Sequence, residues 1–216
     1  MTNLSKARIA GLACTLGGLL FLFYFTGLNG LIAALTPPLE AASVPALKMI
    51  LTCVAAVCMA GGPLGLLALG AAGDGGRRAL GWAGAGLTLL GLLSYIVGSL
   101  FIYNFPERAF RQLFTPGGSA LMTLGMLLLG AAVLRAGRWR GWRAAVPLVT
   151  GLYFPLQFPL QAALFLGKGR GPNPTLLGAW GLCWLLLGIA ISSAACPFKA
   201  SAAYRTGERP AAAPNV

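Results

Sequence analysis

The chain contains no histidine and only four acidic residues in 216 positions. Without imidazole, His-ligated haem, His-containing zinc or di-iron sites and Ser-His hydrolysis are excluded. The four carboxylates are Glu40, Asp74, Glu107 and Glu208, and all of them lie outside the long apolar runs. No carboxylate pair is therefore positioned inside a membrane to cleave peptides, hold magnesium or relay protons. We expect no cofactor and no metal site.

Charged residues are also scarce, at 9% of the chain, whereas 57% of the residues are hydrophobic and 31 more are glycine. Soluble domains contain about 25% charged residues. A globule of this length could not hide so much apolar surface from water. The composition therefore predicts an all-α, polytopic integral membrane protein, and the lack of strand-like alternation disfavours a membrane barrel.

Six apolar runs of about 20 residues predict a bundle of six transmembrane helices. The segments between the runs are too short to fold independently, so we expect residues 1–196 to form one transmembrane domain with short loops. Residues 197–216 are rich in Ala and Pro and lack apolar periodicity, so we expect a disordered cytoplasmic tail. The six runs are residues 9–27, 46–69, 80–103, 118–134, 144–166 and 175–195.

Basic residues are distributed unequally between the two ends of the predicted helices. Because cytoplasmic loops carry the excess of Lys and Arg, we expect both termini in the cytoplasm and the chain in a plasma membrane. In composition and loop style the chain resembles small six-span proteins of GC-rich bacteria, which implies the bacterial inner membrane. Eleven basic residues lie on the side of the termini (Lys6, Arg8, Arg77, Arg78, Arg135, Arg138, Arg140, Arg143, Lys199, Arg205, Arg209) and five on the other (Lys48, Arg108, Arg111, Lys168, Arg170).

The predicted cytoplasmic loop 135–143 interleaves arginines with tryptophans. Guanidinium and indole groups both favour the headgroup layer, so we interpret this loop as an anchor that contacts anionic lipids. The alternatives are a pocket for one anionic headgroup and a contact with a cytoplasmic partner. Nucleic-acid binding is not expected, because the chain offers no soluble folded surface for it. The candidate residues are Arg135, Arg138, Trp139, Arg140, Trp142 and Arg143.

Residues 154–161 repeat the tetrapeptide Phe-Pro-Leu-Gln in the middle of the fifth run. Pro155 and Pro159 each remove an intrahelical hydrogen bond, so we expect this helix to bend or open. Gln157 and Gln161 lie one turn apart and share a face. An amide at bilayer depth needs a hydrogen-bond partner, which would be a neighbouring helix, water or a ligand. The candidate pocket or helix-contact residues are Tyr95, Tyr153, Pro155, Gln157, Pro159 and Gln161.

Small residues mark two further runs. The Gly-Gly-Pro sequence at 61–63 predicts a bend in the second run, and Gly84, Thr88 and Gly91 at helical spacing favour the close approach of another helix to the third. At an offset of 60 residues the chain also aligns with itself, with a basic turn at the same place in each copy. This suggests two helical hairpins of one orientation, formed by runs two and three and by runs four and five.

Two segments on the side opposite the termini give further expectations. Residues 104–114 predict a short amphipathic helix on the membrane surface, started by Pro106. Residues 31–35 follow a turn signal at Asn29-Gly30. They extend the first helix, form an interfacial turn or re-enter the membrane, and the sequence leaves these alternatives open.

Three functions remain compatible with the sequence. The leading hypothesis is a non-enzymatic structural or accessory membrane component, whose glycine-rich faces pack against another membrane protein or a second copy of the chain. The alternative is a small permease or membrane-embedded binding subunit for a neutral or lipid-like solute. It predicts a cavity lined by Gln157 and Gln161, to which Tyr95 or Tyr153 can contribute. The third is an interfacial lipid-acting enzyme that uses Glu40 or Glu107 beside outer arginines.

Overall fold

The computed structural model describes residues 3–28, 43–104, 108–165, 167 and 173–196. Within these residues the chain forms helices and no strand. The predictions for residues 31–35 and for the tail at 197–216 lie outside the described residues. The elements are α1 (Asn3–Phe23), the π-helical turn η1 (Tyr24–Leu28), α3 (Ser43–Met59), α4 (Gly61–Ala68), α5 (Gly76–Asn104), α6 (Arg108–Ala136), α7 (Trp142–Leu164) and α8 (Pro174–Ala195).

Five helical segments of the described chain are long and apolar enough to cross a membrane. α7 has 23 residues and is not among them, because its three prolines and two glutamines lower its mean hydropathy. The all-helical, multi-pass character predicted from composition is confirmed, whereas the sixth span stays a prediction. The five segments are Asn3–Gly27, Ala46–Ala68, Arg78–Leu100, Pro116–Ala136 and Pro174–Ala195.

Large apolar side chains cover the outer surface of these helices. Leu156 is 66% exposed, Val57 63% and Phe158 62%. Soluble proteins rarely expose apolar patches of this extent, whereas lipid tails are as apolar as leucine and carry no such cost. The surface therefore agrees with the membrane location that the long apolar helices indicate.

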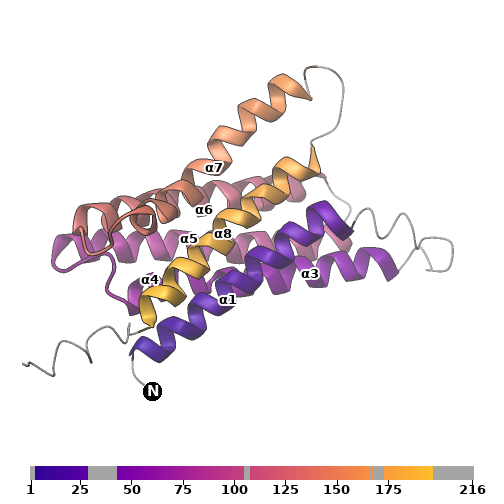
Figure 1. Ribbon diagram of the computed structural model, residues 1–216. Coiled ribbons are helices and arrows are strands. Elements are labelled where there is room, and N and C mark those ends of the chain that lie inside the picture. Colours follow the sequence, from indigo (N-terminus) through magenta and orange to yellow (C-terminus); the bar gives the residue numbers. More distant parts are fainter. Residues whose placement is uncertain (1–2, 29–42, 105–107, 166, 168–172, 197–216) are drawn as a thin grey trace, which may run out of the picture.

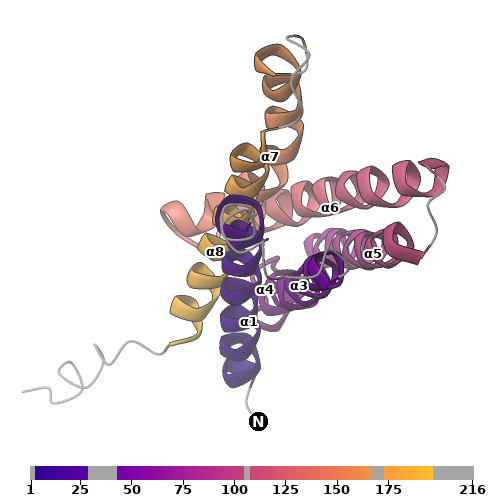
Figure 2. The same cartoon turned by 90° about the vertical axis from the view of Figure 1, so that its right-hand side faces the viewer.

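Two antiparallel helix pairs form the centre of the molecule. α1 lies beside α8, α5 lies beside α6, and the two pairs run in different directions (Figures 1 and 2). α3 and α4 lie against α1, and α7 contacts both α6 and α8. We call the end that holds Asn3, Ala195 and the loops 69–75 and 137–141 the terminal end, and the other the distal end.

Glycines spaced seven residues apart bring the backbones of α1 and α8 into contact. A Cβ added at Gly11 would lie 2.9 Å from the carbonyl oxygen of Gly188, and one at Gly181 would lie 2.6 Å from that of Gly18. A side chain at these positions would force the helices apart. Between the glycines of α1, the Thr15 hydroxyl donates to the Gly11 carbonyl at 3.0 Å, so this hydroxyl is satisfied within its own helix.

The α5–α6 pair uses the same arrangement. A Cβ at Gly84 would lie 2.7 Å from the carbonyl oxygen of Gly125, and one at Gly118 would lie 2.8 Å from that of Gly91. The Thr88 hydroxyl donates to the Gly84 carbonyl at 2.8 Å. Both α1 and α5 thus contain Gly-x3-Thr-x2-Gly, and both partners contain glycines seven residues apart. This repetition relates α1 to α5 and α8 to α6, and it differs from the repeat that the offset of 60 suggested.

The second apolar run is divided at the predicted bend. α3 ends at Met59 and α4 begins at Gly61. A Cβ at Gly61 would clash with the carbonyl oxygen of Ala10, and one at Gly62 would lie 3.1 Å from the Sγ atom of Cys14. The interruption therefore brings the backbone of α4 against α1, and glycine is the residue that fits this contact.

The separate surface helix expected over residues 104–114 is not found. From Arg108 onward the chain already belongs to α6, which continues through Pro116 without a break, so this expectation is wrong for the described part of the segment. A single proline removes only one helical hydrogen bond. The Ser94 hydroxyl also donates to the Phe114 carbonyl at 3.1 Å, which ties the first turns of α6 to α5.

Candidate functional site

The first half of α7 packs closely on α6, and the second half leaves it. A Cβ at Gly130 would lie 2.6 Å from the backbone nitrogen of Leu148, and one at Gly151 would lie 2.8 Å from that of Leu127. Beyond this contact α7 diverges, and its last turns project from the bundle in both views (Figures 1 and 2). α7 is a continuous helix over Trp142–Leu164. Of the two expectations for this helix, a bend or an opening, the opening is therefore wrong.

Two of the candidate polar residues join α7 to α8. The side-chain amide of Gln161 donates to the Asn173 carbonyl at 3.0 Å and accepts from the Asn173 backbone nitrogen at 2.7 Å. The Tyr153 hydroxyl donates to the Leu176 carbonyl at 2.8 Å. Both side chains thus form interhelical hydrogen bonds, the first of the alternatives that the sequence left open.

Gln157 behaves differently from Gln161. It is only 5% exposed, and its Oε1 atom has no hydrogen-bond partner within the described part of the chain. It lines a cavity of about 240 Å³ toward the distal end, between α7 and the helices α1, α5, α6 and α8. Tyr95 lines the same cavity, whereas Gln161 and Tyr153 do not. We call this hollow the Gln157 cavity.

Aromatic side chains form much of the wall of the Gln157 cavity. The ring of Trp180 lies 5.8 Å from that of Phe21 and 5.6 Å from that of Phe154, measured between centroids. The Trp180 indole donates to the Thr150 carbonyl at 3.1 Å, which fixes the orientation of this ring. Among the described residues, no charged side chain lines the cavity. Such a site can bind an uncharged molecule through apolar contact and one hydrogen bond to an amide oxygen.

The two prolines of the repeated tetrapeptide lie outside this cavity. Both are exposed, and Pro155 lines a second hollow, a groove of about 430 Å³ between α6 and α7. Phe154 lines both the cavity and the groove. Phe154 and Phe21 were not among the predicted site residues, because their place in the cavity wall depends on where α6 and α7 separate. We call the second hollow the α6–α7 groove.

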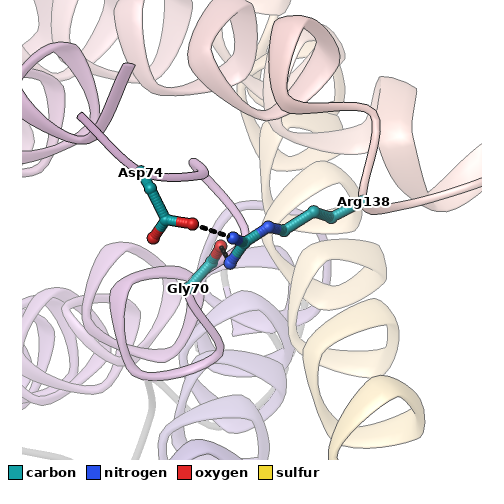
Figure 3. A network of polar contacts seen from close by, with 3 residues as sticks. All are labelled: Gly70, Asp74 and Arg138. Atoms are coloured by element: carbon teal, nitrogen blue, oxygen red, sulfur yellow. Dashed lines mark hydrogen bonds and ion pairs between the residues drawn. The ribbon is translucent and has the colours of Figure 1, made fainter. Parts of the chain in front are cut away.

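The arginine-rich loop lies at the terminal end, next to the loop that follows α4. Arg138 forms an ion pair with Asp74 and donates to the Gly70 carbonyl at 2.9 Å (Figure 3). The Arg138 side chain is 46% exposed and that of Asp74 78%. An exposed pair contributes little stability, about 0–1 kcal/mol. Its structural effect is to connect the two loops.

The other residues of the loop form a basic hollow. Arg140 and Arg143 line a space of about 540 Å³ together with Arg138, Trp139 and the apolar ends of α1, α4 and α8. Neither Arg140 nor Arg143 forms an ion pair with a described residue. Arg135 and Trp142 are exposed and do not line it. We call this space the arginine hollow.

Comparison with known proteins finds no matching family model, curated protein or solved structure. Functional conclusions therefore rest on the chain's own residues. Glu40 and Glu107, the carboxylates of the enzyme hypothesis, lie outside the described residues.

Proposed function

We propose that this protein is a membrane-embedded binding component, or small permease, for a neutral and largely apolar molecule that carries a hydrogen-bond donor. The observation that carries the proposal is the Oε1 atom of Gln157, which has no hydrogen-bond partner among the described residues and lies in a cavity whose described lining is uncharged. A buried acceptor without a partner costs about 1–3 kcal/mol. A donor group on a ligand would remove that cost and so gain affinity.

The structural or accessory hypothesis accounts for less of the site. Interhelical support explains Gln161 and Tyr153, which bond to the backbone of α8 or its cap. It does not explain why Gln157, one turn away, is buried beside empty space. A dry apolar cavity of about 150 Å³ can hold benzene, so the Gln157 cavity has room for a somewhat larger group.

Native mass spectrometry tests this proposal on the full chain extracted gently from its own membrane. We expect wild type and Gln161→Leu to retain a discrete non-protein mass, and Gln157→Leu to lose it. Gln161→Leu is the matched control, because it removes the same amide one turn away without changing the cavity wall. Equal retention by all three proteins would contradict a role for Gln157.

We also propose the complete topology, with six spans and both termini in the cytoplasm. Support comes from α7, which bonds to α8 and touches α6 although its composition is less apolar, and from the basic residues gathered at the terminal end. Cys196 is exposed at the end of α8 and serves as a reporter once the other four cysteines are replaced. A membrane-impermeant maleimide should label it only after cells are permeabilised. Labelling in intact cells would reverse the orientation.

With that orientation, the arginine hollow would face the anionic lipid headgroups of the cytoplasmic leaflet. The described lining of the hollow contains three arginines and no carboxylate, and Asp74 forms an ion pair with Arg138. Each arginine near such a surface contributes about 1 kcal/mol of attraction. We propose Arg140 and Arg143 as the main contacts of the loop with anionic lipid.

A further inference from the structure

The two hollows on either side of Phe154 belong to one place in the fold. α6 and α7 are held together at Gly151 and diverge beyond it. Phe154 comes three residues later and lines both the Gln157 cavity and the α6–α7 groove. A single aromatic side chain therefore belongs both to the wall of the Gln157 cavity and to the wall of the α6–α7 groove.

The α6–α7 groove faces lipid. Leu124 and Phe158, which line it, are 49% and 62% exposed. Its other wall residues are apolar apart from Thr123, whose Oγ1 atom is buried and has no hydrogen-bond partner among the described residues. The described part of the chain places no charged side chain in the lining of the groove. An acyl or alkyl chain matches this lining, because apolar contact is the main interaction that it offers.

We propose that the Gln157 cavity and the α6–α7 groove form one binding site for a single-chain neutral amphiphile, with Phe154 as the movable partition between them. The hydroxyl or amide donor of the ligand lies at Gln157, and its chain lies in the groove between α6 and α7. The molecule enters laterally from the bilayer when the Phe154 ring turns aside. This inference rests on the proposed function and adds to it the ligand class and the access route.

The volumes agree with this assignment. The cavity alone, about 240 Å³, is below the range of roughly 300–1,000 Å³ typical of pockets for drug-sized ligands, whereas the groove adds about 430 Å³. The backbone near the partition is also adaptable, because Pro155 and Pro159 have no N–H and leave two carbonyls of α7 without their helical donors. A bend of the α7 backbone that accompanies ring movement at Phe154 therefore breaks fewer helical hydrogen bonds.

The test uses a long-chain primary alcohol that carries a photoreactive diazirine next to its hydroxyl end, with the protein in phosphatidylcholine nanodiscs. Adducts are mapped by peptide mass spectrometry as a function of incubation time before the flash. We expect saturable labelling of the cavity wall near Trp180 in wild type. The methyl ether of the same probe lacks the donor, so it should label this wall about tenfold less.

Two variants test the proposed lateral route from the bilayer past Phe154 into the Gln157 cavity. Phe154→Ala removes the partition and should speed cavity labelling on the order of tenfold, whereas Ala120→Phe narrows the groove and should slow it. Phe23→Ala is the control, because Phe23 is 47% exposed and lines neither hollow. If Phe154→Ala does not fold, Phe154→Leu gives the same comparison with a smaller change.

The outcomes separate the two proposals. Unchanged rates in Phe154→Ala and Ala120→Phe, with labelling that still depends on the hydroxyl and on Gln157, would overturn the lateral route and leave the proposed function standing. Equal labelling by alcohol and ether in both wild type and Gln157→Leu would overturn the proposed function as well. Faster labelling in Phe154→Ala, slower labelling in Ala120→Phe and no change in Phe23→Ala support the complete site.

Discussion

The glycine-paired helices and the second half of α7 differ in how closely they pack against their neighbours. In the α1–α8 and α5–α6 pairs, glycines seven residues apart let backbones touch, and each intervening threonine hydroxyl bonds within its own helix. In the second half of α7, prolines and glutamines replace the glycines, and the helix departs from α6. The glycine pairs leave no room between their helices, whereas the second half of α7 lies beside a cavity.

This difference separates the helices that pack closely from the part of α7 at which we propose that a ligand binds. Van der Waals contact between close backbones drives helix association in membranes, where burial from water cannot. The paired helices supply that contact on both sides of the site. α7 can then carry a buried amide oxygen without a partner among the described residues, because the closest backbone contacts of the bundle lie in the two glycine-paired helix pairs.

The largest expected effect is the loss of stability when a glycine of a helix pair is replaced. Gly84→Ala places a Cβ 2.6 Å from the backbone nitrogen of Leu129, whereas Gly86→Ala in the same helix meets no atom within 4 Å. Overpacking of this kind costs about 1–3 kcal/mol or more, so Gly84→Ala should lower the unfolding free energy in mixed micelles by about 3 kcal/mol and Gly86→Ala should leave it nearly unchanged. Similar losses in both variants would show that the α5–α6 contact is not as close as described.

A second prediction compares the two glutamines of α7. Gln161→Leu removes both hydrogen bonds to Asn173 and should lower thermal stability, by about 1–2 kcal/mol. Gln157→Leu removes an unpaired buried acceptor and should raise the stability of the ligand-free protein, by about 1 kcal/mol. Thermal unfolding of the delipidated protein measures both. A loss of stability in both variants would mean that Gln157 is hydrogen-bonded inside the protein.

A smaller effect is expected on lipid binding at the terminal end, where the arginine hollow lies. The double change Arg140→Gln with Arg143→Gln should weaken co-purification of anionic over zwitterionic lipid, since each arginine contributes about 1 kcal/mol near an anionic surface. Arg135→Gln is the control, because Arg135 is exposed but does not line the hollow. The loss should diminish as salt is added. If Arg135→Gln lost as much preference for anionic lipid, binding would depend on the total basic charge of the loop and not on the arginine hollow.

The smallest effect concerns the ion pair between the two loops. Asp74→Asn should change stability by less than about 1 kcal/mol, because the pair is exposed and screened. Arg138 also keeps its hydrogen bond to the Gly70 carbonyl. A larger change, measured by the same unfolding assay, would mean that the loop connection supports the whole bundle.

Much of the fold could be predicted from the sequence, because apolar length determines where membrane helices run. The helical, multi-pass class followed from composition, and the interruption of the second run followed from the Gly-Gly-Pro sequence at 61–63. The close approach at Gly84 and Gly91 was also predictable from their spacing. The matching role of Gly11 and Gly18 was missed, because with 31 glycines in the chain a spacing carries little information until the partner helix is known.

The candidate site could be predicted only in part. The repeated tetrapeptide directed attention to Gln157 and Gln161 as equivalent residues, since they share a face of one helix. Their surroundings differ, because the capped start of α8 at Asn173 reaches Gln161 and leaves Gln157 beside the cavity. The role of Phe154 depends on where α6 and α7 separate, which is a property of tertiary packing. No local pattern in the sequence encodes it.

An experimental structure of the protein in nanodiscs made with lipid from its own membrane would examine the divergence of α7 and the occupancy of the Gln157 cavity together. We expect α7 to diverge from α6 beyond Gly151 and non-protein density to lie within hydrogen-bond distance of the Gln157 Oε1 atom. A structure in which α7 packs on the bundle along its whole length, with Gln157 bonded to a neighbouring helix and the cavity filled by protein side chains, would overturn the proposed binding site.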